Sequence, residues 1–131
     1  MATPTKAIAT LIAAATSNTA GSTTRGTVDL RTVFGGVLTA KLTNGATGPT
    51  VQAVVNVLAA HDTGTTPTAA SAGSVWKTIF PQVGGGTSNN AVSEWSWVIP
   101  WGVLHLEVEI TGNTGQTVTC EAFISEVASI A

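Results

Sequence analysis

Residues 102–111 read GVLHLEVEIT and show the clearest apolar–polar alternation in the chain. One set of alternate positions holds only aliphatic side chains: Leu104, Leu106, Val108 and Ile110. The other set is mostly polar: Val103, His105, Glu107, Glu109 and Thr111. A period of two residues is that of a β-strand, whose successive side chains point to opposite faces. The stretch therefore predicts a strand with one face on a core and the acidic face wet.

The rest of the chain is punctuated in the same way. Short apolar or alternating runs are separated by clusters of Gly, Pro, Asn, Ser and Thr, which is typical of an all-β domain. We expect strands at 7–15, 26–34, 36–43, 50–60, 74–80, 91–99, 102–111 and 116–127. The pattern predicts an antiparallel two-sheet sandwich, jelly-roll-like, with about eight strands. The alternative is an up-and-down β-barrel.

Residues 1–131 are expected to form a single domain of this kind. Two segments rich in small polar residues, 1–6 and 16–25, are candidate arms that reach across a neighbouring molecule. No apolar run approaches the ~20 residues needed to span a bilayer, so no membrane segment is expected. Cys120 is the single cysteine, which excludes a disulfide within the chain.

The charge content is low. Five basic and seven acidic residues give a formal net charge of −2, and charged residues make up 9% of the chain. Typical soluble domains carry about 25% charged residues. Such a composition favours a protein whose surface is largely covered by neighbouring molecules. Nucleic acid is not an expected partner, because no basic stripe exists to neutralise phosphates.

No motif predicts catalysis. No Ser or Cys stands in a nucleophile motif, and the adjacent His61 and Asp62 are interpreted as part of a turn. The spacing of His105, Glu107 and Glu109 along one strand face would allow two of these side chains to bind one metal ion. A third ligand would have to come from elsewhere in the chain. We therefore expect no enzyme activity, no metal and no cofactor.

His105, Glu107 and Glu109 carry most of the charge of their expected face. The face is interpreted as either solvated or part of an interface. In an interface, its acids would meet basic residues of a neighbouring copy, which sets register and specificity more than affinity. The candidate basic residues for that contact are Arg25, Arg31 and Lys41.

Three of the four tryptophans are clustered between residues 95 and 101. Trp95 and Trp97 share one strand face, Trp101 starts the next strand, and Trp76 stands apart. Three roles are open: a core, the anchors of a subunit interface, or a platform that stacks on sugar rings. The asparagines at 89–90 are the only near polar donors, which disfavours the sugar platform. All four tryptophans are interface candidates.

Three stretches carry a resemblance to a known class of proteins. They are TVDLRTVFGGVLTAKLTNG (27–45), the Gly48–Pro49 entry to TVQAVVNVLAA (50–60), and GVLHLEVEITGNTGQTVTCEAFISEV (102–127). In these stretches the chain resembles the small jelly-roll decoration (cement) proteins of tailed bacteriophages. The resemblance implies a location on the capsid surface of a virion, many symmetric copies, and no catalysis or cofactor. It maps no individual interface residue.

The function expected from the sequence is therefore structural. A virion protein would decorate and stabilise a phage capsid by bridging neighbouring subunits, with the major capsid protein and copies of itself as partners. The alternatives are a carbohydrate- or receptor-binding β-sandwich, and another phage structural subunit such as a tail or connector protein. A glycan is the less favoured ligand because of the missing polar donors.

Overall fold

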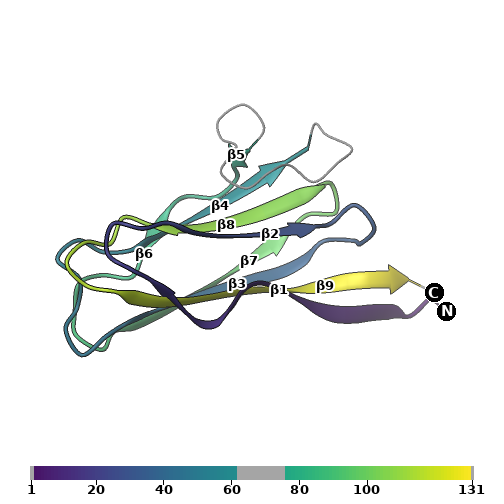
Figure 1. The fold of residues 1–131 in the computed structure, drawn as a ribbon. Helices are drawn as coiled ribbons and strands as arrows, with labels where there is room; N and C mark the ends of the chain where they lie inside the picture. The colour runs from purple at the N-terminus through teal and green to yellow at the C-terminus, as the bar shows by residue number, and fades with distance from the viewer. Residues whose placement is uncertain (1, 62–75, 131) are drawn as a thin grey trace.

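The chain folds into two antiparallel sheets packed face to face (Figure 1). The computed structural model describes residues 2–61 and 76–130. Its strands are β1 (Pro4–Asn18), β2 (Thr24–Asp29), β3 (Gly36–Asn44), β4 (Val54–Ala60), β5 (Lys77–Thr78), β6 (Val83–Gly84), β7 (Val92–Ile99), β8 (His105–Thr111) and β9 (Val118–Ile130). The predicted two-sheet sandwich is confirmed, and the barrel alternative is wrong because the strands lie in two separate sheets. No helix among the described residues is long and apolar enough to cross a membrane.

The order of the strands is that of a jelly roll. One sheet has the order β1-β9-β3-β7, and the other has the order β2-β8-β4-β5, with β6 also pairing with β4. Six connections lead from one sheet to the other, namely β1–β2, β2–β3, β3–β4, β6–β7, β7–β8 and β8–β9. Strands distant in sequence therefore become neighbours. The first and last strands pair directly, from Pro4 opposite Ile130 to Asn18 opposite Val118, which places the two termini side by side (Figure 1).

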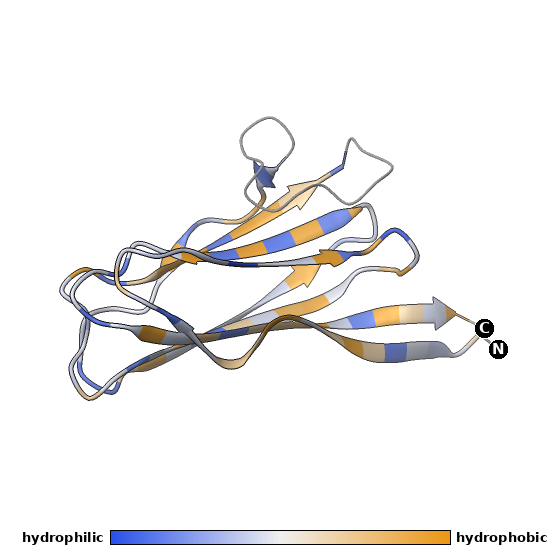
Figure 2. Cartoon of the chain, viewed as in Figure 1, coloured by the Kyte–Doolittle hydropathy of each residue, from blue (hydrophilic) through white to orange (hydrophobic). Residues whose placement is uncertain are grey.

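Alternate side chains of the central strands fill the space between the sheets. From the four-stranded sheet, β3 and β9 contribute Leu38, Ala40, Leu42, Cys120, Ala122 and Ile124. From the opposite sheet, β4 and β8 contribute Val55, Val57, Ala59, Leu106, Val108 and Ile110. All of these are at most 2% exposed, and the alternation of hydrophobic and hydrophilic residues is visible along β8 (Figure 2).

Several strand boundaries differ from the sequence prediction. The strand expected at 26–34 ends at Asp29, because a carboxylate oxygen of Asp29 accepts a hydrogen bond from the backbone nitrogen of Arg31 at 2.9 Å. Such a local bond starts a turn in place of a longer strand. The strand expected at 74–80 is reduced, within its described part, to the two residues of β5.

About half of the positions in the segments 1–6 and 16–25 lie in paired strands within this chain. Residues 4–6 and 16–18 belong to β1, and Thr24 starts β2. Asn18 and Asn113 are both fully buried, and the Asn18 amide donates to the Asn113 side-chain oxygen at 2.5 Å. Asn113 in turn donates to the Asn18 backbone oxygen at 3.0 Å. This pair satisfies its buried polar groups and fastens the β1–β2 connection to the β8–β9 turn.

One glycine is required by the contact between β1 and β2. A Cβ atom on Gly26 would collide with the backbone carbonyl of Leu11. Backbone cannot move aside as a flexible side chain does, so the position demands a residue without a side chain. Gly26 thus allows the edges of the two sheets to approach each other.

Adjacent residues of β3 test the assignment of inner and outer faces. Leu38 is fully buried, whereas Val37 is 42% exposed. Leu38→Ala should lower the free energy of unfolding by about 2–5 kcal/mol, because it leaves a cavity in the core. Val37→Ala should cost under about 1 kcal/mol. Urea denaturation followed by fluorescence measures both, and equal losses would contradict the assigned faces.

Candidate interaction surface

Trp95 and Trp97 face the space between the sheets. They lie opposite Ala40 and Leu38 on β3, on the same side as those core residues. Both indoles are partly buried against the core, and Trp97 stacks on Phe80 with ring centroids 6.2 Å apart. The two tryptophans therefore close the sandwich along β7, and their rings do not form an open platform on its outer face.

The other two tryptophans lie in different surroundings. Trp76 is buried, whereas Trp101 is 65% exposed at the corner between β7 and β8. The Trp101 ring meets Phe34 edge-on, with centroids 5.2 Å apart. The cluster seen in the sequence is thus divided: Trp101 alone of the four presents most of its ring to solvent.

The second face of β8 is not the wet surface expected from its alternation. His105 and Glu107 are fully buried, and Glu109 is partly buried, so the prediction of a solvated face is wrong for the first two. The physical reason is that β8 is a central strand between β2 and β4, so that side chains of both neighbours lie beside its acidic residues. Neither ring nitrogen of the buried His105 has a hydrogen-bond partner among the described residues. Arg25 on β2 pairs with Glu109 at 2.5 Å and with Glu107 at 3.5 Å.

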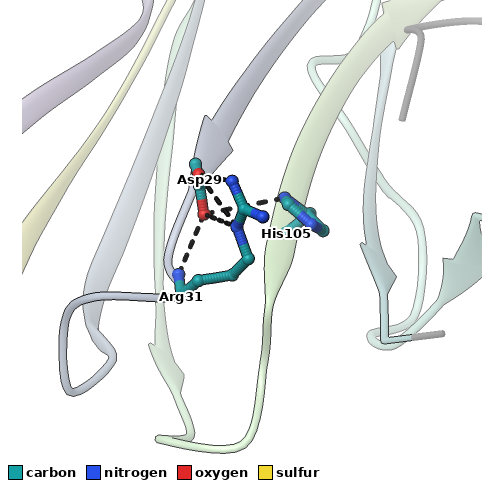
Figure 3. Close-up of polar contacts among 3 residues, drawn as sticks. All are labelled: Asp29, Arg31 and His105. Carbon is teal, nitrogen blue, oxygen red and sulfur yellow. Dashed lines mark hydrogen bonds and ion pairs between the residues drawn. The ribbon is translucent and has the colours of Figure 1, made fainter. Parts of the chain in front are cut away.

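Further polar contacts complete this face of the five-stranded sheet. Asn56 donates to Glu109 at 2.8 Å, and Gln82 donates to Asn56 at 2.8 Å. At the other end of β8, the Nδ1 atom of His105 lies 3.8 Å from a carboxylate oxygen of Asp29 (Figure 3). The basic residues expected to contact a neighbouring copy, Arg25 and Arg31, thus both have acidic partners in their own chain.

The ion pair between Arg31 and Asp29 is well formed. The guanidinium donates to both carboxylate oxygens, with its shortest contact at 2.7 Å (Figure 3). These side-chain bonds, together with the one from the Arg31 backbone nitrogen, lower the pKa of Asp29 from 3.8 to about 2. The same partnership raises the pKa of Arg31. A bidentate arginine–carboxylate contact of this kind favours the charged form of both groups.

The outer face of the four-stranded sheet is organised differently. The strand registers place its outward side chains in rows across β1, β9, β3 and β7. The most apolar row consists of Ile8, Ser125, Val37 and Val98. The next row consists of Thr10, Phe123, Thr39 and Ser96. Ile8 is 70% exposed and Val98 is 75% exposed, so both ends of the apolar row stand open. We call this surface the outer face.

The outer face also carries charges that are not paired. Lys41 on β3 lies opposite Glu94 on one side and Glu121 on the other. Every ion pair found between described residues lies on the five-stranded sheet or its adjoining loop. Lys41, Glu94 and Glu121 therefore have no oppositely charged group within 4.0 Å among the described residues. Charges held apart on an apolar surface are available to groups on another molecule.

A bulge in β1 shapes one side of the outer face. The register with β9 shifts between Ile12 and Thr16, and Ala15 has a positive φ of 60°. Hollows of about 260 and 280 Å³ lie beside this bulge. They are lined mainly by alanine, threonine and isoleucine side chains, with Lys41 and Glu121 at their polar margin. The outer face thus has two hollows beside the β1 bulge.

Groups that could perform chemistry do not converge in the described residues. No cluster of three or more His, Cys, Asp or Glu side chains among them is placed to hold a metal ion. Cys120 is buried, and burial raises the pKa of its thiol, which disfavours the reactive thiolate. His61 is exposed at the end of β4, and its predicted neighbour Asp62 lies outside the described residues.

The outer face was not singled out by sequence reasoning, although a signal for it exists. Along 92–99 and 36–43, the positions between the core residues are mostly Val, Thr and Ser, with few charges. A strand with few charges on either face predicts a cover on each side. The tryptophans of 92–99 stand at the alternate positions, which face the core.

Comparisons with known proteins agree on the fold. No protein-family model and no curated protein matches the sequence. The K3 adhesin domain of Lys-gingipain from Porphyromonas gingivalis W83 superposes with a TM-score of 0.52 and 14% identity, over 83% of this chain and 71% of that one. A chain from the structure of infectious bursal disease virus strain Gx gives 0.50 and 10%, over 93% and 33%. The SPBc2 prophage-derived protein YomS gives 0.45 and 15%, over 94% and 95%. The first two likenesses show the β-sandwich fold and nothing finer.

The Asp29–Arg31 pair makes a prediction about pH. The Asp29 carboxyl should titrate at about pH 2, and Arg31→Gln should move its midpoint up towards 3.8, the ordinary value. Because the folded-state pKa is depressed, the pair stabilises the fold fully above about pH 4. That contribution is lost as the pH falls towards 2. Carboxyl-detected NMR titration measures the midpoint.

The matched control is Arg25→Gln, which removes a guanidinium from the same sheet but leaves Asp29 its partner. The Asp29 midpoint should not change in this variant. Equal midpoints in the wild type and in Arg31→Gln would contradict the assignment.

Proposed function

We propose that the protein is a virion structural protein that decorates a phage capsid and stabilises it by bridging neighbouring subunits. The observation that carries the proposal is the outer face of the four-stranded sheet, where exposed aliphatic side chains, threonines and unpaired charges lie together. The β-sandwich fold is used for many functions. The proposal therefore rests on the outer face, and the fold is only compatible with it.

The proposed binding uses the outer face as an adhesive surface. Burial of apolar atoms contributes about 25 cal/mol per Å², and Ile8, Val37 and Val98 are open at the ends and centre of one row. The neighbouring threonine and serine side chains carry no formal charge, so covering them costs less than covering ions. The charges of Lys41 and Glu94 then orient the partner.

The low overall charge supports the same function. A chain with 9% charged residues has little electrostatic protection against association in solution. On a capsid this is no disadvantage, because neighbouring subunits cover much of the surface. Membership of an ordered particle thus accounts for both the composition and the exposed apolar row.

A carbohydrate- or receptor-binding function is the second candidate, and Trp101 is the observation that favours it. Its ring is mostly exposed, and its neighbours Pro100 and Gly102 line a hollow of about 400 Å³ together with Phe80 and His61. An indole beside a hollow can stack on a sugar ring. A role in the tail or connector of a virion would use the same outer face on another partner.

Capsids that lack the protein test the first proposal. Purified protein added to them should co-sediment and raise their thermal disruption temperature. Ile8→Asp and Val37→Asp should each weaken the binding roughly tenfold or more, since each places a charge in the apolar row. Val51→Asp is the matched control, because Val51 is 51% exposed but lies outside the four-stranded sheet.

Absence of capsid binding, or equal weakening by the control, would contradict the decoration function. Glycan-array binding that is abolished by Trp101→Ala and unaffected by Val37→Asp would favour the second candidate instead.

A further inference from the structure

β7 forms an open edge of the four-stranded sheet. It pairs with β3 on one side, and no described residue pairs with its other side. Edge strands of natural sheets are commonly protected by charged side chains, especially lysine, and by proline, bulges or short length. The eight residues of β7 contain no Lys or Pro, its ladder with β3 has no register shift, and Glu94 is its single charged residue. The opposite edge strand, β1, contains Pro4, Lys6 and register shifts.

The backbone groups on this open edge can be assigned. The Asn44 nitrogen donates to the Ala91 oxygen at 2.8 Å, just before the first residue of β7. Antiparallel ladders alternate between residues that bond to a given neighbour and residues that bond away from it. The odd-numbered residues of β7 therefore bond to β3. The free N–H and C=O groups belong to Val92, Glu94, Ser96 and Val98, whose side chains lie on the outer face.

We propose that β7 pairs with β7 of a second copy of the chain, antiparallel and centred on Trp95. In this register Val92 lies opposite Val98 of the second copy, and Glu94 lies opposite its Ser96. The two-fold axis repeats both contacts. The outward positions read Val-Glu-Ser-Val, a pattern that is complementary to itself: valine meets valine, and a carboxylate meets a hydroxyl. The two sheets become one continuous sheet of eight strands.

The neighbouring registers are worse for electrostatic reasons. Hydrogen bonding between the free groups allows shifts of two residues along the strand. One shift places Glu94 opposite Glu94 of the second copy, and directly opposed like charges are unfavourable in a sheet. The other shift places Glu94 opposite a valine and leaves Val92 without a partner. The Trp95-centred register alone pairs all four residues and separates the two carboxylates.

The same register explains the position of Trp95. It places the Trp95 side chains of the two copies opposite each other at a pair that is not hydrogen-bonded, where side chains approach most closely. Aromatic pairs across strands are favourable. Trp95 is only partly buried by its own chain, and the second copy would cover it. The tryptophan cluster then serves the core of one molecule and the contact between two.

Matched substitutions at Ser96 test the pairing. In the proposed register each residue 96 lies opposite Glu94 of the other copy, twice per dimer. Ser96→Lys should therefore strengthen the dimer and Ser96→Glu should weaken it, with dissociation constants at least roughly tenfold apart. Both variants lose the same hydrogen bond between Ser96 and Thr39, so their difference reports the contact between copies. Sedimentation equilibrium of the purified chain gives the constants.

Val98→Lys tests the register. It should weaken the dimer, because residue 98 then faces Val92, and a lysine on an open edge opposes pairing. The alternative register that places Glu94 opposite a valine would instead put residue 98 opposite Glu94 of the second copy. In that register Val98→Lys would strengthen the dimer. The gain from Ser96→Lys should also diminish in 1 M salt, where charges are screened over about 3 Å.

A wild-type chain that stays monomeric at several hundred micromolar would overturn the proposal. So would equal effects of Ser96→Lys and Ser96→Glu, or a tighter dimer with Val98→Lys. The measurements need no capsid, so self-association is judged separately from the proposed decoration function. Circular dichroism and thermal melting of each variant at low concentration establish that the monomer is folded.

Discussion

The structure depends on the contact between the inner faces of two pairs of central strands. β3 and β9 on one side, and β4 and β8 on the other, contribute alternate side chains that are almost completely buried. Because the period of a strand is two residues, a shift of one residue would turn every core side chain outward. The correct register thus fixes the composition of four surfaces at once: two inner faces and two outer faces. The outer faces consist of the alternate residues that do not enter the core, and these residues determine the properties of the two surfaces.

The two outer faces use their polar residues in opposite ways. On the five-stranded sheet, Arg25 pairs with two carboxylates of β8, and Arg31 holds Asp29. Burial of Glu107 is tolerable because a guanidinium lies beside it. On the four-stranded sheet, Lys41 lies in register with acidic residues but within 4.0 Å of none in the described chain. The five-stranded sheet thus pairs its charged side chains within the chain, whereas the four-stranded sheet leaves its charged side chains open to another molecule.

Local patterns were sufficient to predict most of the fold. Alternation in 102–111, and the punctuation by turn residues elsewhere, predicted the sandwich and nearly all of the long strands. The burial of His105 and Glu107 was not predictable, because it depends on strands that come from distant parts of the sequence. The pairing of Asn18 with Asn113 is long-range in the same sense. The outer face escaped prediction because its rows exist only once β1, β9, β3 and β7 are placed side by side.

The positions of the edge strands and of the charged side chains limit the ways in which two copies of the molecule can associate. A jelly roll has open edges, and each must be short, irregular, covered or paired. β1 is irregular, β5 and β6 are short, and β2 carries Arg25 and Asp29 and lies against β1 at Gly26. β7 is therefore the longest regular edge among the described residues. Its outward residues are continuous with the outer face, since Val98 ends the apolar row and Glu94 ends the charged one. Edge pairing would therefore extend the adhesive face without covering it, and a dimer would present two copies of that face side by side.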